Sequence, residues 1–225
     1  MAYGPHCDCF SPENETDIRL HSTPQDTECA PWQKLLILID YAAAARWETM
    51  DLRAYFSQED LAQITIFPRS IGKLKSVKRL KFYGSYISRI PPEIGEMTSL
   101  EEFYPYSSYT LHWLPYEITR CPNLRDSTIS TRALYGNYKF RNPFPRLPEF
   151  VPDVMPQVCS VCNGRFNEDG PIQRWISLKI ATDVVPLLVH ACSHWCIEQL
   201  PTPPENYVSK PHRGGPTLEQ PPSLI

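Results

Sequence analysis

A proline-centred motif returns at an almost constant interval through the middle of the chain. Three times, a large apolar residue is followed by proline, two variable residues and isoleucine, starting at Phe67, Ile90 and Leu114. The second copy begins 23 residues after the first, and the third begins 24 residues after the second. Such self-similarity constrains the chain to stack short units, each made of one strand and an irregular return segment.

The residues that follow each motif carry apolar side chains at Leu-x-x-Leu-x-Leu spacing. The strands are therefore expected at 77–82, 100–105 and 124–129. Upstream, the spacing predicts a helix over 31–46, after a proline suited to a first turn, and a short strand over 47–52. Over roughly residues 32–135 the chain resembles bacterial leucine-rich repeat proteins. The resemblance implies an α/β fold, a short leucine-rich repeat solenoid with an N-terminal helical cap, which binds another protein on its concave face.

The repeats depart from the family pattern at the position that usually holds asparagine. Ser85, Ser108 and Arg132 stand there instead. Asparagine normally satisfies buried backbone groups of neighbouring turns, so we expect serine, water or a changed bend to satisfy them here.

Composition gives little reason to expect nucleic acid or a membrane as the partner. The 225 residues include 22 basic and 25 acidic ones, and the net charge of −3 provides no general attraction to phosphate. No apolar run approaches the ~18 residues of a membrane span. Residues 1–10 lack the basic start and apolar stretch of a signal peptide. We therefore expect a cytoplasmic protein.

Changes in composition divide the chain into five segments. We expect a loose N-terminal arm, a helical cap with the first strand, the repeats with an aromatic and proline-rich wrap, a metal-binding unit, and an extended proline-rich tail. Their bounds are 1–30, 31–66, 67–150, 151–200 and 201–225. In the wrap, four rings are expected to cover the last repeat, namely Tyr135, Tyr138, Phe140 and Phe144. The tail is expected either to wrap the metal-binding unit or to stay free.

Four of the eight cysteines crowd into one 38-residue stretch. Cys159 and Cys162 form a Cys-x-x-Cys pair followed by a glycine, and Cys192 and Cys196 are spaced to share one face of a helix start. Cytosolic thiols are kept reduced, so ligation is a better interpretation than disulfides. Four soft ligands favour a closed tetrahedral Zn²⁺ site with a structural role.

This segment resembles treble-clef zinc fingers, notably MYM-type fingers and the small bacterial zinc protein that inhibits DNA gyrase. The resemblance rests on the four cysteines and Ser193, while the insert between the pairs is longer and Asn163 replaces a common glycine. Residues 175–180 and 184–189 are expected to form a hairpin over the site. Two alternatives stay open: His190 or His194 replaces one cysteine, or Cys7, Cys9 and Cys29 bind a second metal. Cys121 is expected in the core.

Alternate residues on a repeat strand face outwards, so the repeat register predicts the binding face. On successive strands these residues are Asp51 and Arg53; Arg79, Lys81 and Tyr83; Glu102, Tyr104 and Tyr106; and Asp126, Thr128 and Ser130. Tyrosines flanked by charged residues are typical of protein interfaces, although an ordinary exposed sheet also carries them.

The sequence therefore favours a non-enzymatic protein-interaction module. It contains no Gly-rich phosphate loop, nucleophile elbow or His-Glu-x-x-His motif. The alternative is a nucleic-acid-binding protein that uses the zinc finger, but acidic residues outnumber the basic ones in 151–200. The partner's identity and the oligomeric state stay open.

Overall fold

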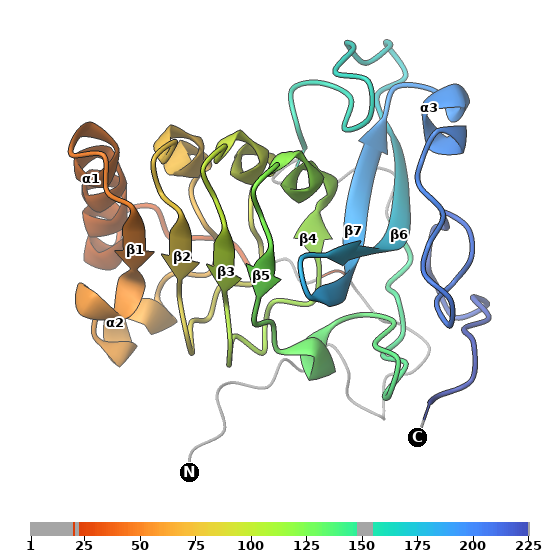
Figure 1. Cartoon of the computed structure of the whole chain (residues 1–225), viewed down its shortest axis with the longest axis horizontal. Coiled ribbons are helices and arrows are strands. Elements are labelled where there is room, and N and C mark those ends of the chain that lie inside the picture. Colours follow the sequence, from red (N-terminus) through yellow and green to blue (C-terminus); the bar gives the residue numbers. More distant parts are fainter. Residues whose placement is uncertain (1–19, 21–22, 148–154, 225) are drawn as a thin grey trace.

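The computed structural model describes residue 20 and the ranges 23–147 and 155–224 (Figure 1). It has a mixed α/β architecture with one parallel sheet, one mixed sheet and few helices. In the described ranges, no helix combines the length and apolar character needed to cross a bilayer.

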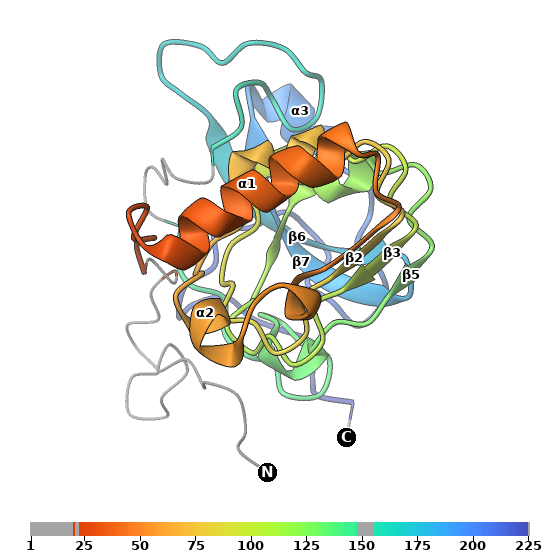
Figure 2. The same cartoon turned by 90° about the vertical axis from the view of Figure 1, so that its left-hand side faces the viewer.

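Helix α1 (Ala30–Ala44) covers one end of the molecule, as the view in Figure 2 shows. Its buried face includes Leu35 and Ile39, and the predicted proline lies in its first turn. The segment after strand β1 (Thr49–Asp51) contains helix α2 (Gln58–Ala62), which a capping box between Ser57 and Asp60 begins. The predicted helix is present, with α2 as an addition.

Four short strands form a parallel sheet in the order β1-β2-β3-β5. The other three are β2 (Arg79–Lys81), β3 (Glu102–Tyr104) and β5 (Asp126–Ser127). The repeat interval places equivalent residues side by side, because Arg79 pairs with Glu102, which pairs with Asp126. The next residue of each strand, Leu80, Phe103 or Ser127, is buried in the interior. The predicted strands are therefore present and in the predicted register.

Each return segment ends in a short 3-10 helix that begins directly after the motif proline. These helices are η4 (Arg69–Lys73), η5 (Pro92–Glu96) and η6 (Tyr116–Arg120), and they pack side by side. The motif isoleucines Ile71, Ile94 and Ile118 lie in these helices, and their side chains are buried. Two further 3-10 helices are η3 (Leu52–Ala54) and η7 (Thr131–Ala133).

Glycine lets the 3-10 helices pack closely. Gly72 and Gly95 occupy the same repeat position, and a Cβ on Gly95 would lie 2.5 Å from the carbonyl oxygen of Glu117 on η6. A Cβ on Gly72 would come no closer than 3.1 Å, to the flexible carboxylate of Glu96. At the same position of the last repeat stands Thr119, which no further repeat covers.

Serines take over the role of the missing asparagines. The hydroxyls of Ser85 and Ser108 lie 2.9 Å apart, and Ser108 donates to the carbonyl of Phe82 at 3.1 Å. In the last repeat, the hydroxyl of Ser130 accepts from the amide of Ser107 at 2.7 Å. Ser130 is buried, so its predicted outward position is wrong, and Arg132 is exposed rather than part of this network.

A long hairpin closes the other end of the stack. Strands β6 (Ile172–Ile180) and β7 (Asp183–Ala191) are antiparallel, as predicted, and β7 also pairs in parallel with β4 (Leu114–Pro115) of the last motif. At the hairpin turn, the hydroxyl of Ser127 on β5 donates to the carboxylate of Asp183 at 2.8 Å. One continuous hydrophobic core therefore extends from α1 to the hairpin.

The aromatic segment and the tail form a second, smaller core. Tyr135 and Phe144 are buried there against Trp175 of β6, but Phe140 is 50% exposed and does not cover the repeat as predicted. The tail extends along β6, where the amide of His212 donates to the carbonyl of Trp175 at 3.0 Å. Leu218 and His212 of the tail thus pack on the aromatic core.

Replacing Gly95 with alanine should lower the free energy of unfolding by about 1–3 kcal/mol, because the new methyl group meets backbone of η6 that cannot move freely. Gly72→Ala is the matched control, since its methyl group would come no closer than 3.1 Å to any neighbouring atom and would meet side chains rather than backbone. Urea unfolding of both variants measures the difference, and equal losses would contradict the explanation.

Lowering the pH should weaken the attachment of the tail. Burial lowers the pKa of His212 to about 4, whereas a histidine in an unfolded chain has a pKa of about 6.5. Between these values the unfolded chain binds a proton that the native chain does not, so stability falls as the pH drops through this window. After allowing for partial exposure, we expect a loss of roughly 1–2 kcal/mol. Between pH 7 and pH 4.5, the free energy of unfolding should fall less for His212→Asn than for the native chain.

Candidate metal centre and exposed sheet face

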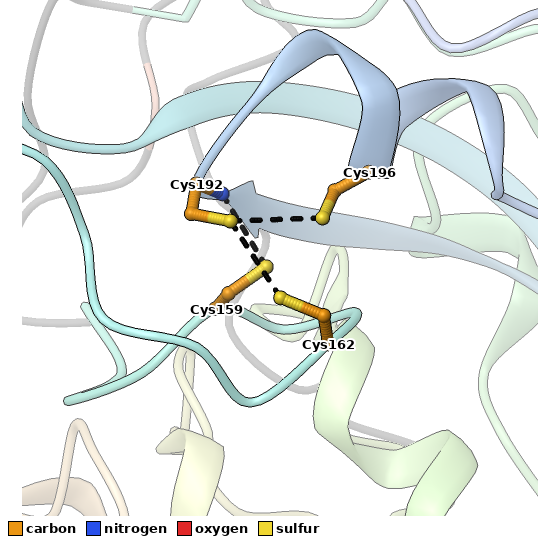
Figure 3. A group of neighbouring side chains, drawn as sticks. All are labelled: Cys159, Cys162, Cys192 and Cys196. Carbon is orange, nitrogen blue, oxygen red and sulfur yellow. Dashed lines mark hydrogen bonds between the residues drawn. The ribbon is translucent and has the colours of Figure 1, made fainter.

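Four cysteine side chains from distant parts of the sequence converge at one point (Figure 3). Cys159 and Cys162 lie on the turn before β6, Cys192 follows β7, and Cys196 lies on helix α3 (His194–Glu198). All four Sγ atoms lie within 4.8 Å of one another. The sulfur of Cys192 lies 3.6 Å from the sulfurs of both Cys162 and Cys196. The four predicted ligands are therefore brought together.

Local structure holds these thiols in place. The left-handed conformation of Asn163, with φ of 60°, turns the chain so that the amide of Gly164 donates to the sulfur of Cys162 at 3.3 Å. The amides of Val161 and Cys192 donate to the sulfur of Cys159 at 3.4 and 3.3 Å. The hydroxyl of Ser193 accepts from the amide of Cys196 at 3.3 Å and caps α3.

The spacing fits tetrahedral coordination by sulfur. A metal–sulfur bond of about 2.3 Å places two ligands of a tetrahedron about 3.8 Å apart. Two of the sulfur–sulfur distances are 3.6 Å and all lie within 4.8 Å, so shifts of about 1 Å or less reach this geometry. The cluster can therefore hold a metal ion through four thiolates.

The thiols differ in how easily they lose a proton. Burial raises the pKa of Cys196 to about 12 and also raises the pKa of Cys192. At Cys159 burial acts in the same direction, but the backbone amides outweigh it and lower the pKa of this thiol to about 7. A bound cation would supply the positive charge that four adjacent thiolates require.

The alternative ligands do not join this group. His190 is buried, and its Nε2 lies 2.9 Å from the side-chain nitrogen Nε2 of Gln173, which donates a hydrogen bond to it. Burial lowers the pKa of His190 to about 4.

Cys29 is the N-cap residue of α1, and within the described ranges it belongs to no cluster of metal-ligating side chains. Cys7 and Cys9 lie outside the described residues. Cys121 is buried in the core, as predicted.

The metal-binding unit is docked on the last repeat. The guanidinium group of Arg120 on η6 donates to the carbonyls of Cys159 and Ser160 at 3.1 and 2.8 Å. Sequence reasoning missed this residue, because Arg120 looks like an ordinary surface cation until the cysteine turn is placed beside it. The hairpin that follows this turn reaches the sheet through Ser127 and Asp183.

Most residues of the predicted binding face lie together on one side of the parallel sheet. We call this surface the sheet face. It comprises Arg79, Lys81, Tyr83, Glu102, Tyr104, Tyr106, Asp126 and Thr128, all of them at least partly exposed. Arg53 lies beside it in η3 rather than on β1, where the sequence placed it.

The tyrosines form a continuous ladder across the sheet face. The rings of Tyr83 and Tyr104 stack with their centroids 6.3 Å apart, and the ring of Tyr106 meets that of Tyr83 edge-on at 6.4 Å. The hydroxyl of Tyr104 donates to Asp126 at 2.7 Å, and this bond raises the pKa of Tyr104 well above its usual range. The ammonium group of Lys81 lies 5.7 Å from the centre of the Tyr104 ring.

Comparisons with known proteins give a limited result. No family model matches the chain, and no curated protein matches it. A solved structure of a leucine-rich repeat protein from Leptospira interrogans is 26% identical over 29% of this chain, with a TM-score of 0.26. This chain covers 18% of that protein, which is too little to carry an argument about fold or function.

Replacing Cys159 with serine should abolish tight binding of one metal ion per chain, because a closed shell of four thiolates loses a ligand. The matched control is Cys29→Ser, which changes a cysteine outside the cluster and should bind the ion normally. Titration with Co²⁺ under reducing conditions, followed by its thiolate absorption, measures both variants. Equal absorption in the two variants would contradict the assignment.

Proposed function

We propose that this chain is a non-enzymatic protein-interaction module. It binds a partner protein on the sheet face, which forms the concave surface of a short leucine-rich repeat solenoid. A zinc-binding unit of the treble-clef type supports the C-terminal end. The observation that carries the proposal is the tyrosine ladder flanked by the charged side chains of Arg79, Lys81 and Glu102, which form no ion pair among the described residues.

The repeat assignment is supported by the agreement between sequence and register. The motif interval of 23 residues coincides with the step between paired strands, since Leu80 lies beside Phe103. The motif isoleucines are buried in equivalent places of successive 3-10 helices. Buried positions that recur in register with a parallel sheet are typical of leucine-rich repeats.

The zinc assignment is supported by the chemistry of the donors. Four thiolates select a soft or borderline ion with tetrahedral preference, and Zn²⁺ is the usual one. The order of elements, a cysteine turn followed by a hairpin and a short helix, agrees with a treble clef. Four protein ligands fill a tetrahedral shell and leave no position for a reactive water, so we assign the ion a structural role.

The sheet face suits a protein partner better than it suits nucleic acid. Aromatic residues and arginine dominate the energetics of protein interfaces. On this face, the carboxylates Glu102 and Asp126 would repel phosphate. On the metal-binding unit, the guanidinium group of Arg174 is partly buried and donates to the carbonyl of Gln173 at 2.7 Å, so it is poorly placed for phosphate.

Changing the sheet face should abolish capture of the partner. We expect wild-type chain to recover a stoichiometric protein from nuclease-treated lysate of the native cell, and Arg79→Glu/Tyr83→Ala/Tyr104→Ala to lose it. The matched control is Tyr41→Ala/Lys210→Glu, which alters an exposed tyrosine and an exposed cation outside this face. Mass spectrometry of the bound fractions identifies the protein.

If all three baits retain the same protein, the sheet face is not the binding surface. Salt-sensitive retention of the wild-type chain on DNA would instead favour the nucleic-acid alternative. Elemental analysis of the purified chain should give one equivalent of zinc, and a value below about half an equivalent would contradict the zinc assignment.

A further inference from the structure

The sheet face carries its charges in an ordered pattern. The strand register sets three rows across the sheet, and the first contains Thr49, Arg79, Glu102 and Asp126. The second row contains Asp51, Lys81, Tyr104 and Thr128, and the third contains Tyr83 and Tyr106. Positive side chains therefore dominate β2, whereas the negative ones of the first row lie on β3 and β5.

Among the described residues, three charged side chains of this face form no ion pair. In the part of the chain that the structure describes, the ion pairs near the sheet join residues just outside the face, such as Lys78 with Glu48 at 2.8 Å. Arg79, Lys81 and Glu102 form no such pair among the described residues. A partner that matches the pattern would gain specificity from these groups.

We propose that the partner on the sheet face is a second copy of this chain, bound about a two-fold axis that runs parallel to the strands between β2 and β3. This inference rests on the proposed function, because it names the occupant of the same surface. Two identical faces that meet about such an axis keep their rows and reverse the order of their strands.

This symmetry places complementary groups opposite each other. Arg79 of one copy faces Glu102 of the other, and Lys81 faces the ring of Tyr104. The third row brings Tyr83 opposite Tyr106, so aromatic rings meet at the edge of the contact. On the outer strands β1 and β5, the hydroxyl of Thr49 faces the carboxylate of Asp126, and the hydroxyl of Thr128 faces the carboxylate of Asp51. No two like charges face each other in the three rows.

The other two-fold arrangement is unfavourable, and this decides the orientation. An axis across the strands would keep each strand opposite its own copy and reverse the rows. Lys81 would then face Lys81, and Asp51 would face Asp51. Like charges placed directly opposite each other disfavour a contact. The charge pattern therefore selects the parallel axis.

The dimer should be weak, because the face is small. Four strands spaced about 4.8 Å apart, with three exposed rows, offer a few hundred Å². A stable interface uses about 800 Å² per partner. We therefore expect a reversible dimer with a dissociation constant on the order of 10–100 μM.

Charge reversal with complementation tests this arrangement. Arg79→Glu and Glu102→Arg should each be monomeric, since each places two like-charged pairs in the contact. An equimolar mixture should regain the dimer, because both pairs become opposite in sign in the mixed species. Sedimentation velocity between about 5 μM and 500 μM under reducing conditions measures this. Lys210→Glu, an exposed cation outside the face, should dimerise like the wild type.

The outcomes separate the dimer from the broader function. A wild-type chain that stays monomeric over this range, or a mixture that fails to regain the dimer, overturns the proposal. Dimerisation that Arg79→Glu leaves unchanged places the contact elsewhere and overturns it too. If the wild-type chain is monomeric but captures a different protein through the sheet face, the dimer fails while the proposed function stands. If it is monomeric and captures nothing, both fail. Near-ultraviolet circular dichroism checks that each variant is folded.

Discussion

The structure depends on the burial of equivalent side chains from successive turns against one another. Ile71, Ile94 and Ile118 are each buried only because the neighbouring turn supplies apolar contacts, and no turn has a core of its own. The same constraint sets the distance between turns, which Gly95 keeps short enough for η5 to touch the backbone of η6. Because each turn relies on the next, the two ends of the stack must be covered by something that is not a repeat.

The two ends are covered in different ways. Helix α1 closes the first turn with an apolar face, which a single amphipathic element can provide. The last turn is closed by the hairpin of β6 and β7, which pairs with β4 on one side and contacts β5 on the other. The segments on either side of this hairpin carry the four cysteines, and Arg120 joins the turn at Cys159 to the last 3-10 helix. A metal ion at this point would therefore hold the cover in place and, through β5, support one side of the sheet face.

Periodic features were predictable from the sequence, and features that depend on docking were not. The spacing of apolar residues predicted the strands, helix α1 and the hairpin. The convergence of the four cysteines was predictable because they occur as two closely spaced pairs. Ser130 was misplaced because alternation predicts orientation only while the strand continues, and β5 ends at Ser127. Phe140 was misplaced because the aromatic segment has no period, so only packing decides which of its rings are covered.

The sequence by itself determined the repeat interval, the register of the parallel strands and which four cysteines come together. These properties depend on local spacing, which the chain carries into any fold it adopts. Only the tertiary structure decided that the hairpin crosses the end of the stack and that Arg120 meets the cysteine turn. Those relations join residues far apart in the chain, and they arise because the last repeat can bury its apolar side only against a segment that has no repeat of its own.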